Sequence, residues 1–84
     1  MNILEEANKI TSEDRHNDYG GPVENFALVA KYWSVYKGIE FKPEDVGMFN
    51  ILQKIAREQF KNKRDNLIDI AGYARTLEMI QKNN

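Results

Sequence analysis

The sequence predicts an all-α fold, a four-helix bundle with one short and three longer helices, built on an antiparallel helical hairpin. Apolar residues recur every three or four positions through most of the chain, which is the spacing of amphipathic helices. Polar segments containing glycine, proline or several charges separate these runs, as expected where one helix ends and the next begins. A chain of 84 residues has room for one hydrophobic core, so we expect a single α-helical domain over residues 1–84.

The hairpin is predicted over residues 46–77. Each half carries an apolar stripe at helical spacing, and the polar segment 61–64 between the halves is short enough for the second helix to fold back beside the first. We expect the two stripes to face the core. Their positions are Val46, Phe49, Leu52, Ile55 and Ala56 in the first helix and Leu67, Ile70, Ala71, Ala74 and Leu77 in the second.

Two further helices precede the hairpin. Apolar residues mark a short helix over residues 3–10, with two glutamates in its first turn, where acids complement the helix dipole. A longer helix is expected from Val23 to about Lys37, because Pro22 suits the first helical position and Gly38 suits the position after the last.

The small size of the chain favours self-association. A domain of this length buries only about 60–65% of its unfolded surface, which leaves little stability to spare. We therefore expect a homo-oligomer. Trp33, Tyr32 and Tyr36 of the second helix are candidate anchors of the subunit contact, with the alternative that these aromatics fill the core.

Composition excludes several kinds of site. The absence of cysteine removes disulfides and thiolate metal ligands. No apolar run is long enough to span a membrane, and the first residues lack the pattern of a secretion signal, so we expect a cytoplasmic protein with no membrane partner. A net charge of −1 argues against a surface for duplex nucleic acid, whereas a local cationic cluster could still hold a small anion.

A charged seam runs along the predicted hairpin. Lys54 and Arg57 project from one side of the first helix, and Asp69 lies on the second. Folding about the middle of the connecting segment places Arg57 opposite Asp69 and Lys54 opposite Gly72, which offers Lys54 no partner. Either the seam is an interhelical ion pair that contributes little if exposed, or it borders a polar pocket where Lys54 and Arg57 meet an anion.

The polar stretch before the second helix is another candidate anion site. Gly20 and Gly21 permit close backbone approach, and the helix that follows exposes N–H groups at the positive end of its dipole. Arg15 could clamp a phosphate group, and Tyr19 could stack on a base. The alternative is a structural turn, since Gly-Gly-Pro suits many connecting loops and the nearby aspartates would repel an anion.

A series of motifs spans nearly the whole chain. They are Asp14-Arg15, Tyr19-Gly20, Asn25-Phe26, Trp33-Ser34, Asp45-Val46, Lys54-Ile55-Ala56-Arg57 and Asp65-Asn66-Leu67-Ile68-Asp69-Ile70-Ala71-Gly72-Tyr73. In this order they resemble a family of short proteins of unassigned function from tailed phages and prophages. The resemblance implies a location in the cytoplasm of an infected host cell and supplies no catalytic residues.

The last motif is also similar, more distantly, to the all-α MazG-like nucleotide pyrophosphohydrolases. Those enzymes hold Mg²⁺ with Glu-Glu-x-x-Glu on one helix and Glu-x-x-Asp on the next. In an overlay, these motifs fall on residues 53–57 and 66–69, and only Asp69 is retained. Lys54 and Arg57 stand where carboxylates are needed, and such cations repel magnesium but can contact phosphate. The similarity therefore implies nucleotide binding without magnesium catalysis.

These observations predict a non-catalytic binder of a small nucleotide-like anion. The phage context suggests sequestration of a host defence signal, such as a cyclic nucleotide or an ADP-ribose derivative. We predict no catalytic residue, metal or cofactor. The predicted ligand-binding residues are Arg15, Tyr19, Gly20, Trp33, Lys54, Arg57, Asp69 and Tyr73.

Two alternatives belong to other classes of function. One is a divergent, magnesium-dependent pyrophosphohydrolase whose metal is held by Asp14, Asp18, Asp65 and Asp69. The other is an interaction module that binds a host or phage protein through the second helix.

Overall fold

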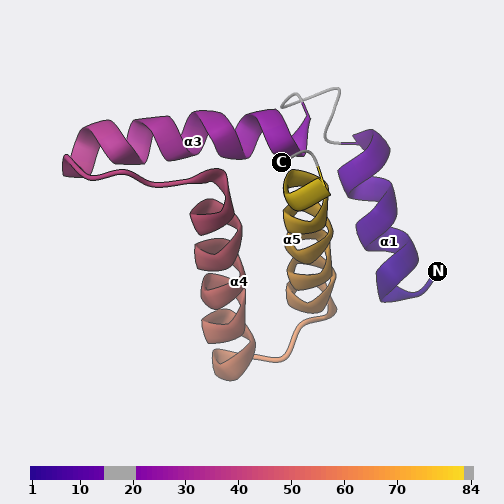
Figure 1. Ribbon diagram of the computed structural model, residues 1–84. Coiled ribbons are helices and arrows are strands. Elements are labelled where there is room, and N and C mark those ends of the chain that lie inside the picture. Colours follow the sequence, from indigo (N-terminus) through magenta and orange to yellow (C-terminus); the bar gives the residue numbers. More distant parts are fainter. Residues whose placement is uncertain (15–20, 83–84) are drawn as a thin grey trace.

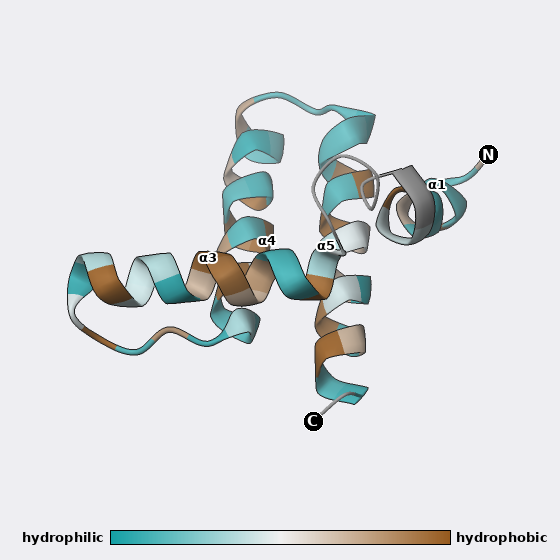
Figure 2. Cartoon of the chain, turned by 90° about the horizontal axis from the view of Figure 1, so that it is seen from above, coloured by the Kyte–Doolittle hydropathy of each residue, from teal (hydrophilic) through white to brown (hydrophobic). Residues whose placement is uncertain are grey.

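The computed structural model describes residues 1–14 and 21–82. In this part of the chain there are four α-helices, one π-helical turn and no strand, which confirms the all-α prediction (Figure 1). The elements are α1 (Ile3–Lys9), the π-helical turn η1 (Ile10–Asp14), α3 (Pro22–Lys37), α4 (Pro43–Phe60) and α5 (Arg64–Lys82). α5 packs between α4 and α1, and α3 crosses near one end of α4 and α5 rather than lying alongside them (Figures 1 and 2).

Local signals account for where the helices begin and end. The backbone N–H of Glu5 donates to the side chain of Asn2, and the backbone N–H of Asn2 donates to the side chain of Glu5, which caps α1 reciprocally. α3 begins at Pro22 and is ended by Gly38, whose φ of 72° lies in the left-handed region that favours glycine. The predicted ends of this helix are therefore confirmed.

The connection from α3 to α4 is held by one hydroxyl. Ser34 donates to the carbonyl of Ala30 at 2.7 Å and accepts from the backbone N–H of Phe41 at 2.8 Å. The next turn is closed by Lys42, whose backbone N–H donates to the carboxylate of Asp45 at 2.8 Å. These bonds set the direction in which α4 leaves α3.

The hydrophobic core lies where α3 crosses α4 and α5. It contains Phe26, Ala30, Val46 and Ile80, with Tyr73 and Trp33 packed against it. Figure 2 shows hydrophobic positions along α3 at this crossing. Few large side chains are fully enclosed, so the core of the single chain is small. None of the helices in the described ranges is long and apolar enough to cross a membrane.

The predicted core face of α4 and α5 is largely wrong for the single chain. Val46 is buried as expected, but Leu52 is 56% exposed and Ile55 is 40% exposed. The buried positions of α5 are Asn66, Ile68, Gly72, Thr76 and Ile80 rather than the predicted stripe. The reason lies in the tertiary packing: α1 and η1 cover a different side of α5, and the described chain leaves Leu52, Ile55 and Leu67 of the predicted stripes exposed.

Two arginines fasten the N-terminal segment to α5. Arg64 forms an ion pair with Glu6 of α1 and donates to the backbone carbonyl of Met1 at 2.8 Å. Arg75 donates to the hydroxyls of Thr11 at 3.1 Å and Ser12 at 3.2 Å. The hydrogen bonds join residues 63 or 64 positions apart, and together with the ion pair they hold α1 and η1 against α5.

Acid is expected to destabilise the fold through Glu58 and Glu6. Hydrogen bonds from the Lys63 backbone N–H and the Asn66 amide lower the pKa of Glu58, and a hydrogen bond from Arg64 lowers the pKa of Glu6, both from an ordinary 4.5. In the folded state each carboxylate therefore binds fewer protons than in the unfolded chain. Its contribution to stability is complete above pH 4.5 and is lost as the pH falls through the folded-state pKa.

Urea unfolding at a series of pH values from neutral to about 3 measures this effect. We expect the free energy of unfolding to fall below pH 4.5, the ordinary value for both carboxyls. The variant Glu58→Gln should fall less steeply, because one of the two groups no longer titrates. An equally steep fall in Glu58→Gln would contradict this account of Glu58.

Candidate functional site

The junction between α4 and α5 is organised around one carboxylate. Glu58, near the end of α4, accepts from the backbone N–H of Lys63 at 2.9 Å and from the side-chain amides of Asn62 at 3.0 Å and Asn66 at 3.1 Å. The loop of residues 61–63 is thus tied back to α4 and to the first turn of α5. This ordering sets the positions from which Lys61 and Lys63 project.

A nearly buried ion pair crosses the seam between the two helices. The ammonium of Lys54 lies 2.7 Å from the carboxylate of Asp69, and their side chains are only 14% and 19% exposed. The expectation that Lys54 lacks a partner is therefore wrong, and so is the expectation that Asp69 pairs with Arg57. Lys54 and Asp69 serve as a structural pair that closes one wall of the site.

The predicted pairing was wrong because the register of α4 against α5 differs from the one assumed. Gly72 faces Ile10 and Thr11 of η1 rather than Lys54, and Gly47 of α4 packs closely against Leu77 of α5. The loop begins at Lys61, as predicted, but it is one residue shorter than the predicted segment 61–64, because α5 already starts at Arg64. The shorter loop, together with the reach of the lysine side chain, brings Lys54 rather than Arg57 to Asp69.

Beside this pair lies a hollow of about 400 Å³, which we call the junction pocket. It is lined by Lys54, Arg57, Phe60, Lys61, Lys63, Asp65, Asn66 and Asp69. Since Lys54 and Asp69 neutralise each other, three cationic side chains face one remaining carboxylate, that of Asp65. Among the residues that the structure describes, Arg57 has no ion pair or side-chain hydrogen bond. The pocket therefore carries an excess of positive charge.

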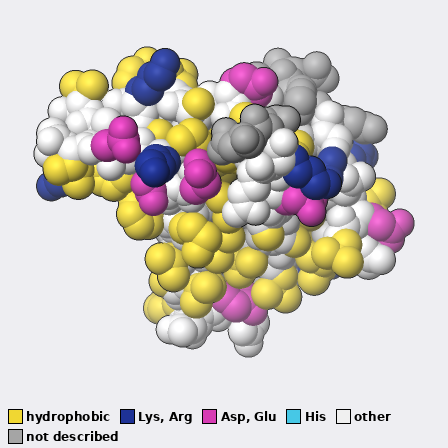
Figure 3. All heavy atoms as spheres, in the orientation of Figure 1, with side chains coloured by type: hydrophobic (Ala, Val, Ile, Leu, Met, Phe, Trp, Pro, Cys, Tyr) yellow, Lys and Arg dark blue, Asp and Glu magenta, His cyan; other side chains and the backbone are white. Residues whose placement is uncertain are grey.

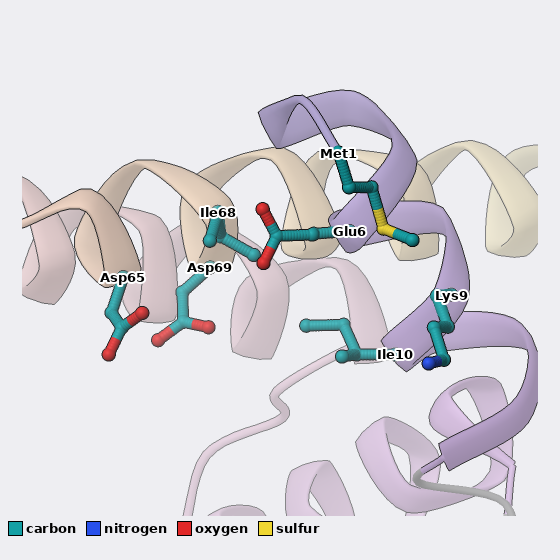
Figure 4. A pocket seen from close by; sticks show the side chains of 7 residues that line it. All are labelled: Met1, Glu6, Lys9, Ile10, Asp65, Ile68 and Asp69. Carbon is teal, nitrogen blue, oxygen red and sulfur yellow. The ribbon is translucent and has the colours of Figure 1, made fainter.

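A second hollow, of about 550 Å³, lies between α1 and α5 (Figure 4). Asp65 and Asp69 line both hollows and project from the same side of α5, with Glu6 of α1 nearby (Figure 4). Glu6 is held by Arg64 and Asp69 by Lys54, so two of the three acids already have cationic partners. Among the side chains that the structure describes, which do not include those of residues 13–20, no group of three acidic, histidine or cysteine residues has the arrangement of a metal site.

Trp33 and Tyr73 lie away from the junction pocket. Trp33 stacks on Phe49 at 5.6 Å between ring centroids and meets Phe41 edge-on at 5.8 Å, and Tyr73 packs on Phe26 at 6.1 Å. Both aromatics thus take part in the packing at the α3 crossing. Of the predicted ligand-binding residues, the structure brings together Lys54, Arg57 and Asp69, and it does not bring Trp33 or Tyr73 to them.

The predicted anion site before α3 is only partly in view. Arg15, Tyr19 and Gly20 lie outside the described residues, as does Asp18 of the alternative metal set. At the start of α3, the carboxylate of Glu24 lies directly against Gly21. An acid thus already occupies the end of the helix where a phosphate would bind.

Sequence reasoning missed the residues contributed by the end of α4 and the loop. Phe60, Lys61 and Lys63 line the junction pocket, yet the segment that contains them reads as a polar connection between helices. The available signal was the concentration of cations next to an aromatic residue at the end of a helix. That signal indicates a site only once the structure shows that the loop lysines line the same hollow as Lys54 and Asp69.

Comparison with known proteins places these features in a family. The family model described as a domain of unknown function (DUF6378) matches residues 2–81. The gene 55 protein of Mycobacterium phage L5 is 46% identical over 83 residues, which cover 96% of this chain and 53% of the phage protein. The gene 55 protein of Mycobacterium phage D29 is 42% identical over 79 residues, which cover 93% of this chain and 52% of that protein.

The chain spans about half the length of these curated relatives. No solved structure matches it. The resemblance to a family of phage proteins is confirmed by these findings, whereas the more distant similarity to MazG-like enzymes stays a prediction.

Proposed function

This chain belongs to the DUF6378 family, which has relatives in mycobacteriophages, and on that premise we propose that it binds a small nucleotide-like anion in the junction pocket without converting it. In this proposal, the cations at the end of α4 and in the following loop hold the phosphate groups. Asp69 keeps Lys54 in place beneath them.

The proposal rests mainly on the guanidinium of Arg57. This group borders the pocket and is paired with none of the described side chains, while Lys61 and Lys63 stand beside the same hollow. A guanidinium can donate two parallel hydrogen bonds to a phosphate, and the two ammonium groups add point charges. A phosphate-bearing ligand would therefore complete the electrostatics of the pocket.

The remaining lining fits the rest of a nucleotide. Phe60 is 92% exposed, so its ring is available to stack on a base. The carboxylate of Asp65 could accept hydrogen bonds from ribose hydroxyls. A hollow of about 400 Å³ lies within the usual range of roughly 300–1,000 Å³ for small-molecule sites. These features favour a nucleotide-like ligand over a simple inorganic anion.

The phage relatives suggest a use for such binding. A protein that holds a nucleotide without turnover lowers its free concentration in proportion to the amount of protein made. We therefore propose that the physiological ligand is a host defence signal, either a cyclic nucleotide or an ADP-ribose derivative, and that the protein acts in the infected cell by sequestration.

Replacing Arg57 with alanine tests the proposal. We expect the wild-type protein to bind ADP, cyclic AMP or ADP-ribose in calorimetric titrations at low ionic strength, and Arg57→Ala to weaken that binding about tenfold or more. The expectation follows from the roughly 1.5–3 kcal/mol typical of hydrogen bonds to charged groups. Ligand recovered after denaturing the protein should be chemically intact.

The matched control is Lys31→Ala, which removes an exposed cation from α3, outside the junction pocket. Lys31→Ala should bind the ligand with wild-type affinity. That result would show that the loss of one positive charge does not by itself explain the weaker binding of Arg57→Ala. Unchanged affinity in folded Arg57→Ala would sink the assignment of the pocket. Release of monophosphate in the presence of Mg²⁺ would instead favour the pyrophosphohydrolase alternative.

A further inference from the structure

An apolar face formed by α4 and α5 is left uncovered in the described chain. We call it the α4–α5 face. It consists of Met48, Leu52, Ile55, Leu67, Ile70 and Ala74. Hydrophobic side chains gather over α4 and α5 in the space-filling view (Figure 3). Most of these residues belong to the stripes that the sequence marks as a core, so their exposure requires an explanation.

We infer that the α4–α5 face binds the same face of a second copy of this chain. In a two-fold symmetric contact, α4 and α5 of one protomer would pack on α4 and α5 of its partner. The four helices would then enclose the apolar stripes between them, as helical bundles do. The four-helix bundle that the sequence pattern describes would thus be completed by two chains.

The exposed area supports a permanent partner. The chain has an accessible surface of 6010 Å², against roughly 5,200 Å² expected for a monomeric protein of 9.8 kDa. The excess of roughly 800 Å² equals what one partner typically buries in a stable protein interface. The internal core is small, so an obligate contact would supply burial that the single chain lacks.

The chemistry of the face favours a second copy over an unrelated protein. Its residues are all uncharged, so the face offers no charge pattern by which a different partner would be selected. Two copies with a net charge of −1 each repel only weakly. The exposed aromatic residues of α3, Tyr32 and Tyr36, carry hydroxyls that tolerate water, whereas Leu52 and Ile55 have no polar atom to keep hydrated.

The proposed contact leaves the junction pocket open. Ile55 and Arg57 are two residues apart on α4, and Leu67 and Asp69 are two residues apart on α5. Two positions correspond to about 200° around a helix, so the apolar face and the pocket lie on opposite sides of the helix pair. Self-association and ligand binding can therefore be tested separately, and failure of one does not imply failure of the other.

Sedimentation equilibrium of the full chain tests the inference. We expect a particle of twice the 9.8 kDa chain mass at micromolar concentrations, with a thermal unfolding midpoint that rises with protein concentration. A folded species of 9.8 kDa at every concentration would overturn the inference, and the face would then be free for the additional residues that the longer relatives carry.

Two substitutions locate the contact. Leu52→Glu should weaken dimerisation more than tenfold, whereas Val35→Glu, at an 84% exposed position of α3, should not. The reverse pattern would place the contact on α3 and refute the proposed face. Because Leu52→Glu could unfold an obligate dimer, Leu52→Cys offers a milder probe in a chain without cysteine. A short bismaleimide should join two copies of Leu52→Cys and not of Val35→Cys, and equal joining of both would count against the inference.

Discussion

Replacing Asp69 with alanine is expected to destabilise the protein by about 2–3 kcal/mol, because it leaves the Lys54 ammonium nearly buried without a counter-charge. Removing one member of a fully buried pair typically costs about 3–5 kcal/mol, and the partial exposure of this pair reduces that cost. For a chain of 84 residues, a change of this size lowers the thermal midpoint by roughly 10 °C or more. Thermal and urea unfolding measure it directly.

The double variant Lys54→Met/Asp69→Leu is the informative control. It removes both charges while keeping much of the apolar volume, so most of the stability lost in Asp69→Ala should return. Arg57→Ala should change stability by no more than about 0.5 kcal/mol, since its side chain is exposed and unpaired among the described residues. If Arg57→Ala were as destabilising as Asp69→Ala, Arg57 would also have a structural role, and the distinction between Arg57 and the Lys54–Asp69 pair would be wrong.

The different roles of Lys54 and Arg57 determine which variants are useful in a binding experiment. A variant of Lys54 would lose affinity through unfolding or through displacement of Asp69, so it cannot report on phosphate contact alone. Arg57 and Lys63 are the better probes, because they border the pocket without joining the two helices through their side chains. The sequence pattern treats Lys54 and Arg57 alike, and their different surroundings separate their roles.

The helices and their ends were predictable because the signals are local. Pro22, Gly38 and the polar loop after Phe60 act through their own backbone geometry and hydrogen bonding, and the structure places helix ends at these positions. The charged seam was also predictable in part, because Lys54 and Asp69 lie on the two helices of the hairpin at positions that can face each other.

The choice of buried face and the register were not predictable, because both depend on distant residues. α5 presents apolar side chains on more than one side, and the fastening of α1 through Arg64 and Arg75 decides which side becomes covered. Shortening the loop by one residue changes which cation meets Asp69. Phe60 and the loop lysines enter the site only through this folding back, so no local pattern marks them as ligand-binding residues.

Two buried helical glycines are expected to respond in opposite directions to alanine. A Cβ at Gly47 would lie 2.5 Å from Leu77 Cδ2 and 2.8 Å from Leu77 Cγ, so Leu77 must leave its place between α4 and α5. Overpacking of this kind typically costs about 1–3 kcal/mol, which exceeds the gain of about 1 kcal/mol in helix propensity. A Cβ at Gly72 would meet Thr11 at 3.5 Å and Ile10 at 3.8 Å, which is ordinary contact.

Urea unfolding should therefore show Gly47→Ala to be less stable than the wild type by about 1–2 kcal/mol, and Gly72→Ala to be equal to it or more stable by up to about 1 kcal/mol. The clash with Leu77 can be isolated by comparing Leu77→Ala with Gly47→Ala/Leu77→Ala. Once the leucine is truncated, the added methyl group at position 47 should no longer be destabilising. A loss of stability that persists in the double variant would mean that the clash with the Leu77 side chain is not the cause of the destabilisation.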